Sequence, residues 1–208
     1  MTRNFLIRGR THKLAKVIFI GQDANYDPKL TDDHPFLDKI IEYHRDPITF
    51  WNKQNVHHPF LLHEYSSNGL KGGYRYHNRF HAMGLRPSLH DQISFIELLD
   101  VPTVGSSNDQ LFWELFNSEH AERIDELIQE GAPRLVLITN KSVNQYMRKA
   151  QKEFGVFQWL PRRFEYGELD RIGDTIIYGF RHFSSSQTNE YLSDLGNIIT
   201  EFCEGDPI

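Results

Sequence analysis

The feature that most constrains this fold is a set of short, continuous runs of Val, Ile, Leu and Phe. Strands of a parallel sheet are buried on both faces, so they carry unbroken apolar runs instead of alternating ones. The runs are Lys16–Ile20, Arg134–Thr139, Asp174–Phe180 and a less pure one, Gln92–Leu98. The sequence therefore predicts four strands of a mostly parallel sheet.

Helical patterns separate these runs. Gly155 is placed to end one helix and Thr188 to cap another. Alternating strands and helices imply right-handed crossovers with helices on both faces of the sheet. We therefore expect an α/β fold, a three-layer α/β/α sandwich with a mostly parallel four-stranded central sheet, built by residues 1–208 as a single domain. The expected helices are Pro35–Tyr43, Tyr74–Met83, Ser107 to a stop at Gly131, Ser142–Phe154 and Asn189–Phe202.

Composition excludes several classes of protein. With 23 basic and 28 acidic residues the net charge is −5, which is too mild for a disordered acidic tail and unlike a basic nucleic-acid coat. A single cysteine, Cys203, excludes an internal disulfide and cysteine-rich metal sites. No apolar run approaches the ~20 residues that cross a bilayer, and the N-terminus lacks a signal-peptide core. We expect a cytoplasmic monomer with no membrane contact.

Polar residues follow each expected strand, where open α/β sheets bind their ligands. Asp23 comes after the first strand and His182 after the fourth, and both ends meet at one edge of the sheet. A carboxylate and an imidazole facing one hollow can activate a water and stabilise a leaving group. We therefore expect this pair to carry the chemistry.

Two of these segments resemble motifs of the uracil-DNA glycosylases. VIFIGQDANY at 17–26 is similar to the family's first motif, a strand followed by Gly-Gln-Asp-Pro-Tyr-His. YGFRHFSSSQ at 178–187 is similar to the second, a strand followed by His-Pro-Ser-Pro-Leu-Ser, although only His182 and Ser184 match there. The order of strands and helices between the motifs also agrees, so the resemblance covers most of the chain.

This resemblance implies a monofunctional DNA glycosylase that hydrolyses the N-glycosidic bond of uracil or a related deaminated base, without metal or cofactor. By position, Asp23 would orient the attacking water, and His182 would stabilise negative charge on the uracil O2. The backbone at Gln22 would read the base edge and Ser184 would contact a phosphate. Phe36 would stack on the base, although it also lies on an apolar helix face that suits core packing.

The sequence departs from the family pattern around the base. The tyrosine that excludes thymine falls on Asn25, with Tyr26 one position late, and both are base-binding candidates. The base-reading asparagine aligns with Glu97, whose ionised carboxylate accepts hydrogen bonds but cannot donate one to a carbonyl. Asn25 or Asn140 is therefore the candidate donor.

The segment expected to contact DNA also departs from the family. The intercalating leucine falls on Ser186, so a wedge is either absent or supplied by Phe183. These changes predict an altered base preference, or a preference for single-stranded or mismatched sites, where base flipping costs less. Candidate cations for DNA are Arg181 beside the histidine, Lys71, Arg75, Arg79, Lys141, Arg162 and Arg163.

Other interpretations remain open. A family member without activity would only bind nucleic acid, and a flavodoxin-like domain would bind a small molecule without salt-dependent DNA affinity. The histidines His57, His58, His77 and His81 suggest a metal, but the glutamate of an HExxH motif is missing, so surface histidines are favoured. The irregular stretch 47–73 is expected to be a surface loop, with an insertion or lid as the alternative.

Overall fold

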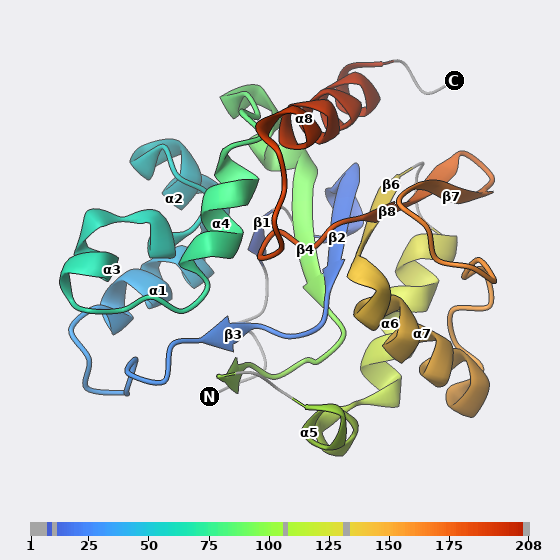
Figure 1. Cartoon of the computed structure of the whole chain (residues 1–208), viewed down its shortest axis with the longest axis horizontal. Coiled ribbons are helices and arrows are strands. Elements are labelled where there is room, and N and C mark those ends of the chain that lie inside the picture. The colour runs from blue at the N-terminus through green and yellow to red at the C-terminus, as the bar shows by residue number, and fades with distance from the viewer. Residues whose placement is uncertain (1–7, 10–11, 106–107, 131–133, 206–208) are drawn as a thin grey trace.

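The computed structural model describes residues 8–9, 12–105, 108–130 and 134–205, and its centre is a six-stranded sheet (Figure 1). Four strands are parallel neighbours, in the order β4 (Ile93–Glu97), β2 (Val17–Gly21), β6 (Leu135–Thr139) and β8 (Thr175–Phe180). They are the four strands that the apolar runs predict. The expectation of four strands in total was too low, because β1 (Arg8–Gly9) and β7 (Gly167–Ile172) add antiparallel edges.

Helices cover both faces of the sheet, which makes the expected three-layer sandwich. On one face, Ile18, Ile20 and Val136 pack against α5 (Asp109–Leu115), α6 (Ser118–Gln129) and α7 (Asn140–Phe154). On the other face, Phe19 and Leu137 pack against α2 (Pro47–Gln54), α4 (Tyr74–His81) and α8 (Asn189–Glu204). Burial on both faces explains why the strand sequences do not alternate.

Local signals set most of the helix ends. Gly155 adopts a left-handed conformation, φ 76°, directly after α7, and the Thr188 side chain accepts a hydrogen bond from the Tyr191 N–H at the start of α8. The helix expected from Ser107 to Gly131 is two helices, α5 and α6. Ser107 lies outside the described residues, and the Asn108 side chain caps α5 instead.

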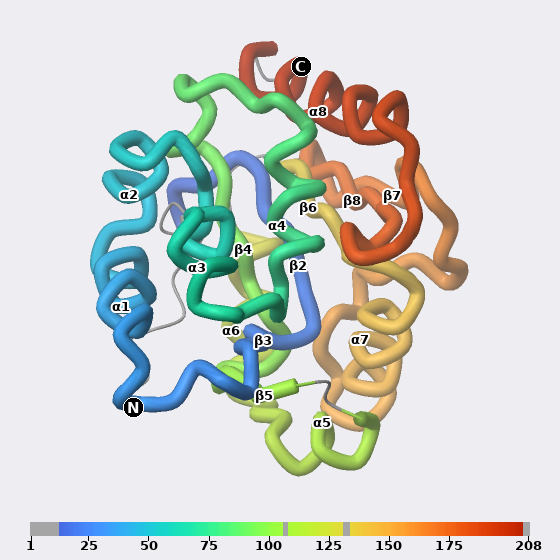
Figure 2. The backbone as a smooth tube through the Cα atoms, turned by 60° about the vertical axis from the view of Figure 1, so that its left-hand side comes forward, coloured from blue at the N-terminus to red at the C-terminus, as the bar shows by residue number. Residues whose placement is uncertain are grey.

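A separate group of short helices lies beside the carboxyl edge of the sheet. Stretch 47–73 is largely helical, with α2, the 3₁₀ turn η3 (Pro59–Leu61) and α3 (His63–Ser67), so the expectation of a plain loop was wrong. Together with α1 (Leu37–Arg45) it builds a satellite core around Phe60 and Tyr65. Figure 2 shows this helical group on one side of β2 and the pair α5 and α7 on the other.

The strand order places a ligand site between β2 and β6. The chain passes from β2 to β4 on one side and then returns to β6 on the other, so the order reverses at this point. Open α/β sheets bind ligands at such a reversal, outside the carboxyl ends of the strands. Two 3₁₀ turns, η2 (His12–Leu14) and η4 (Pro87–Gln92), lie elsewhere, and no helix of the described residues is long and apolar enough to span a membrane.

Candidate active site at the carboxyl edge of the sheet

A cavity of about 490 Å³ opens where β2, β4, β6 and β8 end. Its size lies within the range of ligand sites, ~300–1,000 Å³. Eight of the twelve residues singled out in the sequence line it: Gln22, Asp23, Asn25, Tyr26, Glu97, Asn140, His182 and Ser184. The sheet thus brings together residues that are up to 162 positions apart in the chain, from Gln22 to Ser184.

Asp23 is held by a short two-stranded ribbon that the sequence did not predict. In this ribbon, β3 (Asn25–Tyr26) pairs in parallel with β5 (Thr103–Val104), so that Asn25 lies opposite Thr103. The buried Thr103 hydroxyl donates a hydrogen bond to Asp23 Oδ2. This bond fixes the carboxylate at the cavity.

His182 is oriented by its own loop. The Ser184 backbone N–H donates a hydrogen bond to His182 Nδ1 at 3.1 Å, and the Tyr76 ring lies 5.2 Å from the imidazole, centroid to centroid. Burial lowers the pKa of His182, although the negative charge of Asp23 acts in the opposite direction. The ring is therefore assigned as neutral at pH 7, with its proton on Nε2.

Glu97 and Asn140 supply polar groups from the two strands that flank β2. Glu97 lies opposite Gly21 in the sheet, and a methyl group on Gly21 would collide with the Glu97 carboxylate. Asn140 begins α7 with φ 66°, and its Oδ1 accepts a hydrogen bond from the Val143 N–H at 3.0 Å. The Asn140 amide oxygen is therefore occupied, which leaves the NH₂ group as its donating end.

Asn25 and Tyr26 both line the cavity, as the shifted motif allowed. The Tyr26 hydroxyl shares a hydrogen bond of 2.6 Å with His44 Nε2 on α1, and the Tyr26 ring packs edge-on against Phe60. This pairing anchors the tyrosine to the satellite core. Tyr26 is thus a rigid wall of the cavity.

Four of the singled-out residues do not line the cavity. Phe36 is 2% exposed and packs against Tyr65, so it serves the core packing that its apolar helix face suits and does not reach the cavity as a base-stacking ring. Phe183 is fully buried against Phe19 and Phe180, which rules it out as a wedge in this conformation. Arg181 and Ser186 are exposed beside the cavity. An apolar side chain on a helix or loop serves core packing more often than ligand contact, and sequence alone did not separate the two.

One wall of the cavity, which α4 and the preceding loop provide, was not predicted from the sequence. Tyr76, His77 and Gly72 line the cavity together with Asp27. Burial acts to raise the pKa of Asp27, but hydrogen bonds from the Lys71, Lys29 and Gly72 N–H groups outweigh it and hold that pKa below its usual value. Asp27 therefore ties the loop before α4 to the segment after β2. No local sequence signal marked this contact, although the turn cluster around Gly72 was visible.

Three of the four histidines, His57, His58 and His77, are buried, contrary to the expectation of surface positions, whereas His81 is exposed as expected. His57 and His58 are 3% and 1% exposed, and His57 Nε2 lies 2.9 Å from His77 Nδ1. Burial holds the pKa of His57 well below its usual value. Among the described residues, no group of three or more His, Cys, Asp or Glu side chains is arranged to hold a metal ion.

Four cations surround the mouth of the cavity. Each is exposed and adjacent in the chain to a lining residue: Lys71, Arg75, Lys141 and Arg181. None of them forms an ion pair with another described residue, and the Arg181 guanidinium lies over the rings of Tyr166 and Tyr191. The lining itself carries three carboxylates, Asp23, Asp27 and Glu97, so these cations lie next to an acidic cavity. No family model matches this chain, and no curated protein matches its sequence.

Proposed function

We propose that the protein is a DNA glycosylase that hydrolyses the N-glycosidic bond of uracil or a related deaminated base. One observation carries the proposal: Asp23 and His182 line the same cavity, and each is oriented by a hydrogen bond from another residue. A second support is the resemblance of the segments that follow β2 and β8 to the two glycosylase motifs. Cys203, the only cysteine, is a buried free thiol, which fits a reducing compartment such as the cytoplasm.

The chemistry follows from where charge develops. Breaking an N-glycosidic bond leaves positive charge on the sugar and negative charge on the base. The Asp23 carboxylate would face the sugar, balancing its charge and orienting the attacking water. The His182 Nε2–H would donate to the base oxygen on which the negative charge gathers. Fixed groups of this kind stabilise the transition state without reorganising.

Glu97 and Asn140 would read the edge of the base. An ionised Glu97 accepts a hydrogen bond from a ring N–H, and the Asn140 NH₂ donates one to the neighbouring carbonyl. Uracil presents a ring N–H beside a carbonyl, and so does hypoxanthine. Cytosine presents an unprotonated ring nitrogen beside an amine, so both contacts would be repulsive. Tyr76, half-buried at the cavity, is the aromatic wall best placed to replace Phe36 beside the base.

DNA would approach over the cations at the mouth and deliver an unpaired base. The second motif offers no exposed apolar wedge, because Phe183 is buried and Ser186 is short and polar. Opening a duplex costs a few kcal/mol, and least where the base is already unpaired. We therefore propose single-stranded or mismatched DNA as the preferred substrate.

An excision assay tests this function. Oligonucleotides carry one uracil, hypoxanthine, thymine mismatch or cytosine, in single-stranded and duplex form, and alkali cleaves the strand wherever a base is removed. We expect nicking at uracil or hypoxanthine, stronger in single strands, and none at cytosine. Absence of nicking with all bases would contradict the proposed activity, and a clear duplex preference would contradict the proposed substrate.

A further inference from the structure

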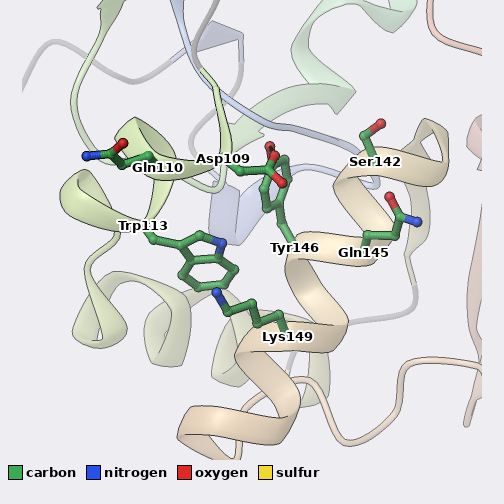
Figure 3. Close-up of a pocket in the computed structure, with 7 residues that line it drawn as sticks. All are labelled: Asp109, Gln110, Trp113, Ser142, Gln145, Tyr146 and Lys149. Atoms are coloured by element: carbon green, nitrogen blue, oxygen red, sulfur yellow. Dashed lines mark hydrogen bonds between the residues drawn. The ribbon is translucent and has the colours of Figure 1, made fainter.

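A second hollow lies directly beside the candidate active site. This groove, of about 620 Å³, runs between α5 and α7 and is lined by Asp109, Gln110, Trp113, Ser142, Gln145, Tyr146 and Lys149 (Figure 3). The groove and the cavity share the first turn of α7, because Asn140 lines the cavity and Ser142 lines the groove. Two residues of α-helix span only ~3 Å along the axis.

The floor of the groove is rigid. Tyr146 stacks on the buried ring of Phe112 at 3.9 Å between centroids, and its hydroxyl donates a hydrogen bond of 2.6 Å to Asp109 Oδ1. Burial, together with the hydrogen bond to Asp109 and the charges of Asp109 and Asp23, raises the pKa of Tyr146 to about 12.

Trp113 gives the groove an aromatic wall. Its indole is half-buried, and the exposed Lys149 places its Nζ 4.1 Å from the ring centroid (Figure 3). A flexible lysine over an indole can exchange that position for a phosphate, which frees the ring face for a base. Aromatic rings flanked by cations are the usual platform for unpaired bases.

Lys141 lies on the helical turn between the two hollows and is exposed. A strand that inserts one base into the cavity must pass its next phosphate over this turn. The next nucleotide is joined to the extruded one through a single phosphate, so its base falls within reach of a groove that shares the first turn of α7 with the cavity. The position of Lys141 suits that linking phosphate.

We propose that the groove between α5 and α7 binds the base adjacent to the excised one on the same DNA strand, stacked on Trp113, with the linking phosphate at Lys141. This inference rests on the proposed function, because it takes the cavity as the site of the extruded base. The contacts are to a ring face, a phosphate and amide groups. They therefore favour an unstacked single strand over a continuous duplex.

A binding cycle tests the groove without requiring catalysis. The probe is a labelled single strand with one 2′-fluoro-deoxyuridine, in which the fluorine makes the glycosidic bond resistant to hydrolysis. Affinity is measured by fluorescence anisotropy. In two further probes the nucleotide on the 5′ or the 3′ side lacks its base. For wild-type protein, we expect one of the two baseless probes to bind about tenfold more weakly. Trp113→Ala should bind the complete probe about tenfold more weakly than wild type does. Its affinity for the baseless probe that weakens wild-type binding should be only slightly lower than its affinity for the complete probe.

Controls separate a local effect from unfolding. Trp113→Phe keeps a ring and should recover part of the affinity, whereas Trp159→Ala removes an indole outside the groove and should leave the coupling intact. Thermal unfolding of each variant checks the fold. The groove proposal would be overturned if the missing base lowered the affinity equally in wild type and Trp113→Ala, or if no probe bound. If the effect of the missing base depends on Trp113 but no base is excised, the groove proposal holds and the proposed activity is overturned. If bases are excised but the effect does not depend on Trp113, the activity holds and the groove proposal is overturned.

Discussion

The Ser184 backbone N–H donates a hydrogen bond to His182 Nδ1 at 3.1 Å. Because Nδ1 is the acceptor, the single proton of the neutral imidazole lies on Nε2. Burial lowers the pKa of His182 and keeps the ring neutral at pH 7 despite the nearby Asp23. The site therefore contains a neutral, oriented donor.

Thr103→Val should slow excision while leaving the fold intact. The substitution removes the hydroxyl that donates to Asp23 but keeps the volume of the side chain. A mispositioned carboxylate balances the sugar charge less well, and we expect a fall of roughly tenfold in the single-turnover rate. Thr200→Val, which removes a hydroxyl bonded to Gly196 on α8, is the matched control and should not change the rate. Equal rates for Thr103→Val and wild type would contradict the positioning role.

Gly21→Ala should act through Glu97. The added methyl group collides with the Glu97 carboxylate, which lies at the flexible end of a side chain and can move away. We expect little change in stability but a loss of base affinity similar to that of Glu97→Ala. The double variant should then be no worse than either single one, because both remove the same contact. Additive losses in binding assays would show that Gly21 and Glu97 act separately.

Affinity for single-stranded DNA should fall steeply as salt rises. Each phosphate contact that is lost lowers the slope of log affinity against log salt by ~0.7. Neutralising Lys71, Arg75, Lys141 or Arg181 one at a time should reduce the slope by about that amount. Arg171→Gln, at an ion pair with Glu168 on β7, is the control. A slope that no mouth variant changes would place DNA elsewhere.

The fold should lose stability as the pH falls below about 6.5, the usual pKa of histidine. Burial lowers the pKa of His57, and burial likewise lowers that of His90 to about 4. Between the lowered folded value and 6.5, the unfolded chain binds protons that the folded chain does not. Each such histidine costs up to about 1.4 kcal/mol of unfolding free energy per pH unit. Urea unfolding at pH 7.5, 6.5 and 5.5 checks the direction, and His90→Gln should flatten the dependence.

The sequence predicted the parts of this fold that carry repeated local signals. Unbroken apolar runs located the four parallel strands of the central sheet, and caps such as Gly155 and Thr188 located helix ends. The strand ends then identified eight of the residues that line the cavity, because parallel strands deliver their carboxyl ends to one edge. These strands and helix ends follow from burial and backbone geometry, and each of them can be recognised within a single segment of the sequence.

Contacts between distant segments could not be predicted in this way. The pairing of Asn25 with Thr103 depends on two strands of only two residues each, and the Asp27 contacts to the loop before α4 depend on the tertiary path. Phe36 and Phe183 show the converse error. The resemblance suggested base or DNA contacts for Phe36, downstream of the first motif, and for Phe183, in the second. An aromatic ring near an apolar core gains more by burial.

The most direct test compares base removal by wild type, Asp23→Asn and His182→Ala in single-turnover alkali-nicking assays on single-stranded uracil DNA. Loss of the His182 donor should slow excision roughly 10²–10³-fold, and Asp23→Asn should also lower the rate, with binding of the 2′-fluoro probe retained in both. Excision that survives both substitutions at the wild-type rate would contradict the assignment of this acid and imidazole to one glycosidic bond.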